Sequence, residues 1–189
     1  MSRIVHAAVT ATGLAAAVTA ALAFGAAPAF AIGPATVTKS GTILTLTAAP
    51  GTQDTIRIHE NTTTFGIRDL SGLRAGTGSG CIAAAGNTID LTCSKAAITR
   101  LVVKAGDFDD NIGIGAPATS TITYEAFGGP GNDAVALNTP HSIEHGEAGN
   151  DFLANTSFQF PATLDGGTGT DRCARGTARD SLISCESIA

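Results

Sequence analysis

Eight residues in the C-terminal half decide the fold, and they read Gly128-Gly129-Pro130-Gly131-Asn132-Asp133-Ala134-Val135. Three glycines precede an aspartate, and a large apolar residue follows two positions later. Glycine adopts the positive φ angles of a tight loop without steric penalty, and it lets backbone carbonyls approach closely. The alternation after the aspartate is typical of a short strand whose apolar side chains point to one face. This stretch therefore predicts a tight loop that leads into a β-strand.

The same pattern recurs on both sides of this stretch. The further copies are Ala105–Ile112, Gly146–Leu153, Gly166–Cys173 and a faint last one, Arg175–Leu182. Residues 128–133 and 166–171 keep all three glycines and the aspartate, whereas Phe108, Glu147 and Ala178 depart from the pattern. Gly51–Ile56 echoes it faintly. Self-similarity at a fixed period is the signature of architectures in which similar units stack.

All copies approximate G-G-x-G-x-D-x-U, where U is a large apolar residue. In this form the chain resembles the hemolysin-type (RTX) calcium-binding repeat family over residues 105–182. The resemblance implies an all-β fold, a right-handed parallel β-helix or β-roll solenoid, with Ca²⁺ held between successive coils. Two nonapeptides would form one coil of about 18 residues, with loops on opposite edges.

The spacing of the aspartates suits calcium. Asp133 and Asp151 are 18 residues apart, so they are expected on the same edge, one coil apart. Parallel strands lie about 4.8 Å apart, so an ion midway lies roughly 2.4 Å from each loop level. That value falls within the range of Ca–O bonds of about 2.3–2.6 Å, whereas Mg²⁺ requires shorter bonds and keeps its waters.

The predicted metal ligands are of three kinds. The main carboxylates are Asp110, Asp133, Asp151 and Asp171. Weaker side-chain candidates are Asp109, Asn132 and Asn150. Carbonyl oxygens are expected from the loop glycines Gly129, Gly131, Gly149, Gly167 and Gly169. The alternative is that these loops are only turns, since Gly, Asn and Asp are common in any turn.

Two of the spacings are irregular. Asp110 and Asp133 are 23 residues apart, and Asp151 and Asp171 are 20 apart. These values require loops that bulge from the coil by about five and two residues relative to an 18-residue coil. We therefore expect an irregular solenoid that binds calcium mainly along one edge.

Residues 1–31 have the features of a secretory signal peptide. Arg3 precedes an apolar, Ala-rich run from Ala7 to about Ala27, and Ala29-Phe30-Ala31 forms the small-x-small cleavage site. The run is long enough to span a bilayer, but it lacks a charge on its far side and ends in Pro28. We expect a helical signal that is cleaved after Ala31, with no later membrane span, and a secreted or surface-associated protein.

Composition excludes some classes of function. Without the signal, 158 of 189 residues remain, enough for one domain, with 10 basic and 16 acidic residues and a net charge of −6. This sign argues against nucleic acid, whose phosphates require a basic face, and it suits a chain that binds cations. Aromatic residues are 5% with no Trp, which weakens the case for a sugar-stacking surface.

The four cysteines predict disulfides. An even number in an exported chain is typical of disulfide pairing. Twelve residues separate the members of each neighbouring pair, so Cys81–Cys93 and Cys173–Cys185 are the natural choice among three connectivities. No spacing matches a zinc motif.

Residues 32–104 carry short β-type runs without a helical period. These runs are Val37, Ile43–Thr47, Ile56–Ile58, Phe65–Ile67, Ile89–Leu91 and Leu101–Val103. We interpret 32–104 as a β region that caps or extends the solenoid, and 105–189 as the repeat region, because repeat stacks need atypical ends.

Other motifs carry less weight. His141–His145 reads H-x-x-E-H, but Pro140 and Gly146 leave no room for a catalytic helix, so a zinc protease is disfavoured. Asn61-Thr62-Thr63 and Asn155-Thr156-Ser157 fit the glycosylation sequon, to which we attach no function.

The sequence therefore predicts a non-enzymatic, extracellular calcium-binding protein with a structural or surface-interaction role. Two alternatives remain. One is a surface adhesin or matrix protein that binds an unknown partner through a β face, which a row of outward threonines would favour. The other is a β-helix hydrolase, which a cleft with two carboxylates away from the repeat loops would favour.

Overall fold

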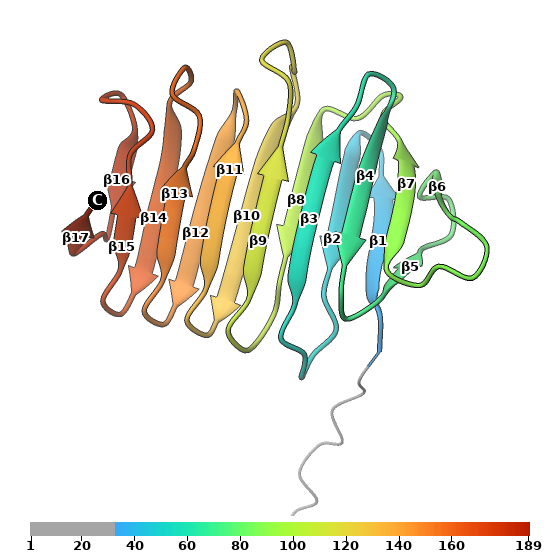
Figure 1. The fold of residues 1–189 in the computed structure, drawn as a ribbon, viewed down its shortest axis with the longest axis horizontal. Helices are drawn as coiled ribbons and strands as arrows, with labels where there is room; N and C mark the ends of the chain where they lie inside the picture. Colours follow the sequence, from blue (N-terminus) through green and yellow to red (C-terminus); the bar gives the residue numbers. More distant parts are fainter. Residues whose placement is uncertain (1–32) are drawn as a thin grey trace, which may run out of the picture.

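A computed structural model describes residues 33–189, which form β-strands and connecting loops (Figure 1). The all-β class predicted from the sequence is confirmed. The predicted signal peptide, 1–31, lies outside the described residues. In the described part of the chain, no helix is long and apolar enough to cross a membrane.

The strands form two sheets that lie face to face (Figure 1). In spatial order the first sheet contains β16 (Ser181–Ile183), β14 (Ala162–Thr168), β12 (Ser142–Ala148), β10 (Thr123–Pro130), β8 (Arg100–Lys104), β2 (Ile43–Thr47), β1 (Ala35–Ser40) and β5 (Leu73–Ala75). The second contains β17 (Ser187–Ile188), β15 (Arg172–Ala174), β13 (Phe152–Asn155), β11 (Ala134–Asn138), β9 (Asn111–Gly115), β3 (Thr55–Glu60), β4 (Thr64–Asp69), β7 (Asp90–Ser94) and β6 (Cys81–Ala83).

From β8 to β17 the chain alternates between the two sheets. Each strand pairs in parallel with the strand two positions later, so that β8 pairs with β10 and β9 with β11. We call two consecutive strands, one from each sheet, a layer; β8–β9, β10–β11, β12–β13, β14–β15 and β16–β17 are such layers. The strand pair β2–β3 forms a further layer, because β2 pairs in parallel with β8 and β3 with β9.

The N-terminal end of both sheets contains antiparallel pairs, although β5 pairs in parallel with β1 at the edge of the first sheet. β1 and β2 form a hairpin, with Gly41 at a φ of 59° in its turn. In the second sheet β3, β4, β7 and β6 follow one another in antiparallel pairs. The two sheets are therefore mixed, and hydrogen bonding runs without interruption from residues 33–104 into the repeats.

The core lies between the two sheets and follows from the alternation of side chains. In β11 the buried residues are Val135 and Leu137, and in β9 they are Ile112 and Ile114, while the residues between them are less buried. Because strand side chains alternate between faces, each sheet contributes one apolar face. The core is mainly aliphatic, with Phe65 and Tyr124 among its largest fully buried side chains.

Both predicted disulfides are confirmed. Cys81–Cys93 joins β6 to β7, where the two cysteines are direct partners across the strands. Cys173–Cys185 joins β15 to the segment before β17. Each lies near one end of the sheets, where fewer neighbouring strands hold the chain.

The H-x-x-E-H string lies in a strand rather than a helix. Glu144 points into the core and is fully buried, whereas His145 stacks on Phe127 with ring centroids 4.5 Å apart. Neighbouring residues in a strand point to opposite faces. Glu144 and His145 therefore cannot bind one metal ion together.

Candidate functional site

Five aspartates stack along one edge of the molecule, where first-sheet strands lead into second-sheet strands. We call Asp54, Asp110, Asp133, Asp151 and Asp171 the aspartate ladder; each directly precedes a strand of the second sheet. The register of these strands places the residues after successive aspartates side by side, as in Ala134 with Phe152. The four aspartates that were the main predicted ligands thus share one edge, as their spacing suggested.

Each ladder carboxylate after Asp54 is held by the backbone of the preceding layer. The N–H groups of Asp54 and Asp110 donate to Oδ1 of Asp110 and Asp133, at 2.6 and 2.8 Å. The N–H groups of Asp133 and Asp151 donate to Oδ1 of Asp151 and Asp171, at 2.8 Å each. The ladder therefore binds successive layers together through main-chain to side-chain hydrogen bonds.

The irregular spacings arise on the opposite edge. Between β9 and β10 the chain needs residues 116–122, whereas residues 139–141 suffice between β11 and β12. Residues 156–161 connect β13 to β14. Separations of 23, 18 and 20 residues between successive aspartates are therefore compatible with one regular ladder.

The first glycine of each repeat leaves room for the carboxylate. A methyl group on Gly128, Gly146 or Gly166 would collide with Oδ2 of the aspartate five residues later. Only a residue without a side chain lets the aspartate fold inward over this position. The glycine and the aspartate of one repeat are therefore a single packing unit.

The later glycines allow close approach of neighbouring layers. They have positive φ angles, and a Cβ on any of them would collide with a carbonyl oxygen of the preceding layer; they are Gly129, Gly131, Gly149, Gly167 and Gly169. At the position of the second glycine, Glu147 also has a positive φ, of 76°. These glycines were predicted as carbonyl ligands. The close approach of the layers already requires glycine at these positions, whether or not an ion is bound.

The ladder carboxylates are buried, and each has one oxygen without a partner. The five residues are at most 3% exposed, and the unpartnered atoms are Oδ1 of Asp54 and Oδ2 of Asp110, Asp133, Asp151 and Asp171. Burial, together with the charges of neighbouring carboxylates, raises the pKa of Asp110 to about 8 and that of Asp133 to about 7. Burial also raises the pKa of Asp151.

A buried carboxylate outside the ladder, Glu60, is balanced by a basic side chain, whereas within residues 33–189 the ladder carboxylates are not. Glu60 accepts a hydrogen bond from the hydroxyl of Tyr124 and forms an ion pair with Lys95. None of the ion pairs within residues 33–189 involves a ladder aspartate. The charge of the ladder is therefore balanced by no basic side chain of the described chain.

The weaker predicted ligands form a separate, solvent-facing row. Asn132 donates its N–H to Oδ1 of Asp109 at 2.7 Å, and Asn150 donates its N–H to Oδ1 of Asn132 at 2.9 Å. Thr170 continues the row by donating to Asn150. These side chains stack on one another on the exposed side of the loops, apart from the buried carboxylate oxygens.

Sequence reasoning missed both ends of the ladder. Asp54 is its first member, and the faint echo at Gly51–Ile56 was the signal for it. At the other end Asp171 donates its N–H to Glu186 Oε2 at 2.6 Å, and no repeat pattern marks Glu186. Asp180, the aspartate of the faint last copy, lies on the opposite edge, where it accepts the N–H of Ala162 at 3.0 Å.

The ladder offers oxygen donors to a metal ion. In the part of the chain from 33 to 189, no group of three or more His, Cys, Asp or Glu side chains is arranged to hold a metal. The available donors are carboxylate and main-chain oxygens. Oδ2 of Asp151 and the carbonyl oxygen of Gly166 border the same small space beside Gly146, since a methyl group there would collide with both. Oxygen-only donors of this kind are those that calcium prefers.

No known protein family, curated protein or solved structure matches this chain. The functional argument therefore depends on the residues of the ladder and their surroundings.

Proposed function

We propose that the chain is a secreted, non-enzymatic calcium-binding protein and that the aspartate ladder is its binding site. One observation carries the proposal: successive layers each bury a carboxylate with an unpartnered oxygen, and no basic side chain within residues 33–189 balances them. A buried charge is strongly unfavourable unless it is paired or coordinates a metal. A divalent cation satisfies both the charge and the free oxygen.

The ion would be held by residues of two successive layers. Asp110, Asp133, Asp151 and Asp171 would supply their free oxygens, and loop carbonyls such as that of Gly166 would complete the set. Bound calcium would supply positive charge between carboxylates that otherwise repel one another. The chain itself contributes the glycine loops, which bring these oxygens close together.

The finer architecture belongs to the same proposal. The strands alternate between two sheets, pair in parallel from layer to layer, and bury one face each. These features support a parallel β-roll solenoid extended at its N-terminal end by the antiparallel strands. Secretion is supported by the predicted signal at 1–31 and by the two disulfides, which persist in oxidising compartments.

One outward row across the middle of the first sheet does not favour the adhesin alternative. In register they are Thr45, Val102, Glu125, Ile143 and Thr163. This row mixes apolar, acidic and hydroxyl side chains, so it is no continuous threonine row of the kind that would favour adhesion.

Calorimetric titration of the exported protein with Ca²⁺ tests the proposal, together with melting curves in calcium and in chelator. An ion that binds only the folded state stabilises it by RT ln(1 + [L]/Kd), about 2.7 kcal/mol at a hundredfold excess over Kd. We expect heat of binding and a higher melting temperature in calcium. A melting curve that chelator leaves unmoved would show that the repeats are only turns.

A further inference from the structure

We infer that Asp54 and Asp69 together form a calcium site that lies outside the repeats, at the N-terminal end of the aspartate ladder. This site does not depend on calcium binding by the repeats, because Asp69 belongs to the antiparallel part of the second sheet. It is built from a hairpin that carries no G-G-x-G-x-D pattern at Asp69.

The β3–β4 hairpin brings the two carboxylates together. Asp69 pairs with Ile56 across the hairpin, and Asp54 lies two residues before Ile56, on the same inner face. Asp54 is therefore the diagonal neighbour of Asp69 across the hairpin, and its charge contributes to raising the pKa of Asp69. Both residues are buried, Asp54 being 1% exposed and Asp69 0%.

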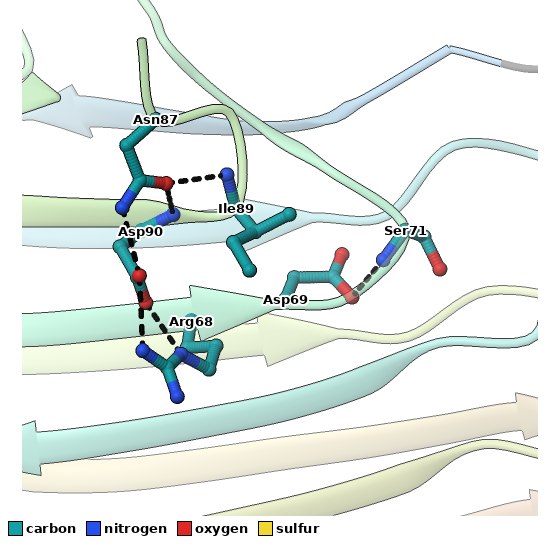
Figure 2. Close-up of polar contacts among 6 residues, drawn as sticks. All are labelled: Arg68, Asp69, Ser71, Asn87, Ile89 and Asp90. Atoms are coloured by element: carbon teal, nitrogen blue, oxygen red, sulfur yellow. Dashed lines mark hydrogen bonds and ion pairs between the residues drawn. The ribbon is translucent and has the colours of Figure 1, made fainter. Parts of the chain in front are cut away.

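Each carboxylate has one oxygen in use and one free. The Thr52 hydroxyl lies 2.8 Å from Asp54 Oδ2, and the N–H of Ser71 donates to Asp69 Oδ1 at 3.1 Å (Figure 2). Asp54 Oδ1 and Asp69 Oδ2 have no hydrogen-bond partner. Two buried carboxylates that are neighbours across the hairpin are therefore each left with one unsatisfied oxygen.

Among the described residues, 33–189, no basic side chain forms an ion pair with Asp54 or Asp69. The nearest in sequence, Arg68, points to the other face of β4, where its Nε lies 2.6 Å from Asp90 Oδ1 (Figure 2). Asn87 also donates to Asp90, at 2.9 Å, so that this outer network is complete without Asp69. Burial and the charge of Asp54 raise the pKa of Asp69 to about 6.

The chemistry of the donors selects the ion. The pair offers carboxylate oxygens, and no histidine or cysteine thiol within residues 33–189 joins it. Zinc and other transition metals favour nitrogen and sulfur ligands, whereas calcium takes oxygen ligands in flexible geometry. Calcium is therefore the ion that this pair fits.

The test counts bound calcium in the full exported chain by equilibrium dialysis and calorimetry near pH 7.5. Asp69→Asn keeps the shape of the side chain, and its amide can donate to Asp54 Oδ1. We expect this variant to bind one calcium fewer than the parent. Asp90→Asn, on the outer face of the neighbouring strand, is the matched control and should bind as many ions as the parent.

Asp151→Asn separates this site from the repeats. It should weaken calcium binding by the ladder and leave the Asp54–Asp69 ion in place. If Asp151→Asn changes nothing but Asp69→Asn still loses one ion, the proposed function of the repeats fails and this site stands. If Asp69→Asn folds and binds as much calcium as the parent, the inference is wrong.

A shared proton is the other way to satisfy the pair. Carboxyl titration by NMR distinguishes the two: an uptake of one proton by Asp54 and Asp69 above pH 7 that calcium does not displace would overturn the inference. Should Asp69→Asn fail to fold, Asp54→Asn is measured in its place, with the same expected loss of one ion.

Discussion

The backbone N–H of Asp133 donates a 2.8 Å hydrogen bond to the carboxylate of Asp151, eighteen residues later in the chain. Parallel strands usually meet through main-chain bonds alone, but here a side chain also joins the layers. Replacing Asp151 therefore has two separable effects: loss of an acceptor for a buried N–H, and loss of a buried charge.

Two substitutions at Asp151 separate these effects. Asp151→Ala leaves the N–H of Asp133 without its partner, and a buried unsatisfied group costs about 1–3 kcal/mol, so we expect a loss of that size in chelator and a larger loss in calcium, where a ligand is removed as well. Asp151→Asn keeps the acceptor and removes the charge. It should match or exceed the parent in stability in chelator, and gain less than the parent from added calcium. Denaturant unfolding in both conditions measures this, with the outer-face variant Asp165→Asn as control.

Gly149 is predicted to tolerate no side chain. Its φ is 147°, and a methyl group would collide with the carbonyl oxygen of Gly131 in the preceding layer. Overpacking and backbone strain together predict a loss of about 3 kcal/mol or more for Gly149→Ala. Gly115→Ala is the control, since a methyl group there finds only ordinary contact with His59. Equal stability of the two variants would show that the layers can separate at this loop.

Glu147→Gly should stabilise the protein. Glu147 has a φ of 76° at a position where the neighbouring repeats have Gly129 and Gly167. A left-handed conformation costs a residue with a side chain about 1–2 kcal/mol, partly offset by the greater freedom of glycine in the unfolded chain. We expect a rise in melting temperature of about 2–4 °C. Glu147→Ala removes the same charge but keeps Cβ, and it should not show this rise.

Glu144 predicts a pH dependence of stability. Its carboxylate accepts the N–H of Ala154 at 3.1 Å, its other oxygen has no partner, and burial raises its pKa well above the ordinary value. A group whose pKa is raised in the folded state binds its proton more tightly there. Its contribution is therefore present at acid pH and is lost as the pH rises above the ordinary glutamate pKa.

Glu144→Gln keeps the acceptor and removes this titration. The variant should be more stable than the parent at pH 8 and nearly equal to it at pH 4.5, as measured by melting curves in chelator. If the difference in melting temperature between parent and variant is the same at pH 4.5 and pH 8, the pKa of Glu144 does not change on folding.

The glycines and aspartates that recur in the C-terminal half predicted where the tight loops and the strands after them lie. The sequence located the strands before and after each loop, the shared edge of Asp110, Asp133, Asp151 and Asp171, and both disulfides. It assigned the loop glycines to ion binding, whereas the structure shows the steric reason for them: their layers approach too closely for Cβ.

The parts that were missed depend on contacts between distant segments. Asp69 enters the core only because β4 folds back on β3, and no local sequence pattern predicts that pairing. Glu186 ends the ladder by reaching Asp171 from a loop of different length, with a side chain one methylene longer than aspartate. Asp180 matches the aspartate position of the repeat pattern. It nevertheless lies on the opposite edge, because of the path that the chain takes after β15.

The hydrogen bond from each aspartate N–H to the next carboxylate also determines which insertions and deletions this fold can tolerate in evolution. Every layer presents a donor to one neighbour and an acceptor to the other, so all interior junctions are chemically alike. Consider a gene duplication or deletion that begins and ends at equivalent positions, such as a loss of residues 134–151. After it, the N–H donor of one layer again meets the carboxylate acceptor of the next, and no layer is left without a partner. Change by whole layers is therefore the evolutionary step that this architecture tolerates, while an insertion of a few residues is accommodated only on the opposite edge.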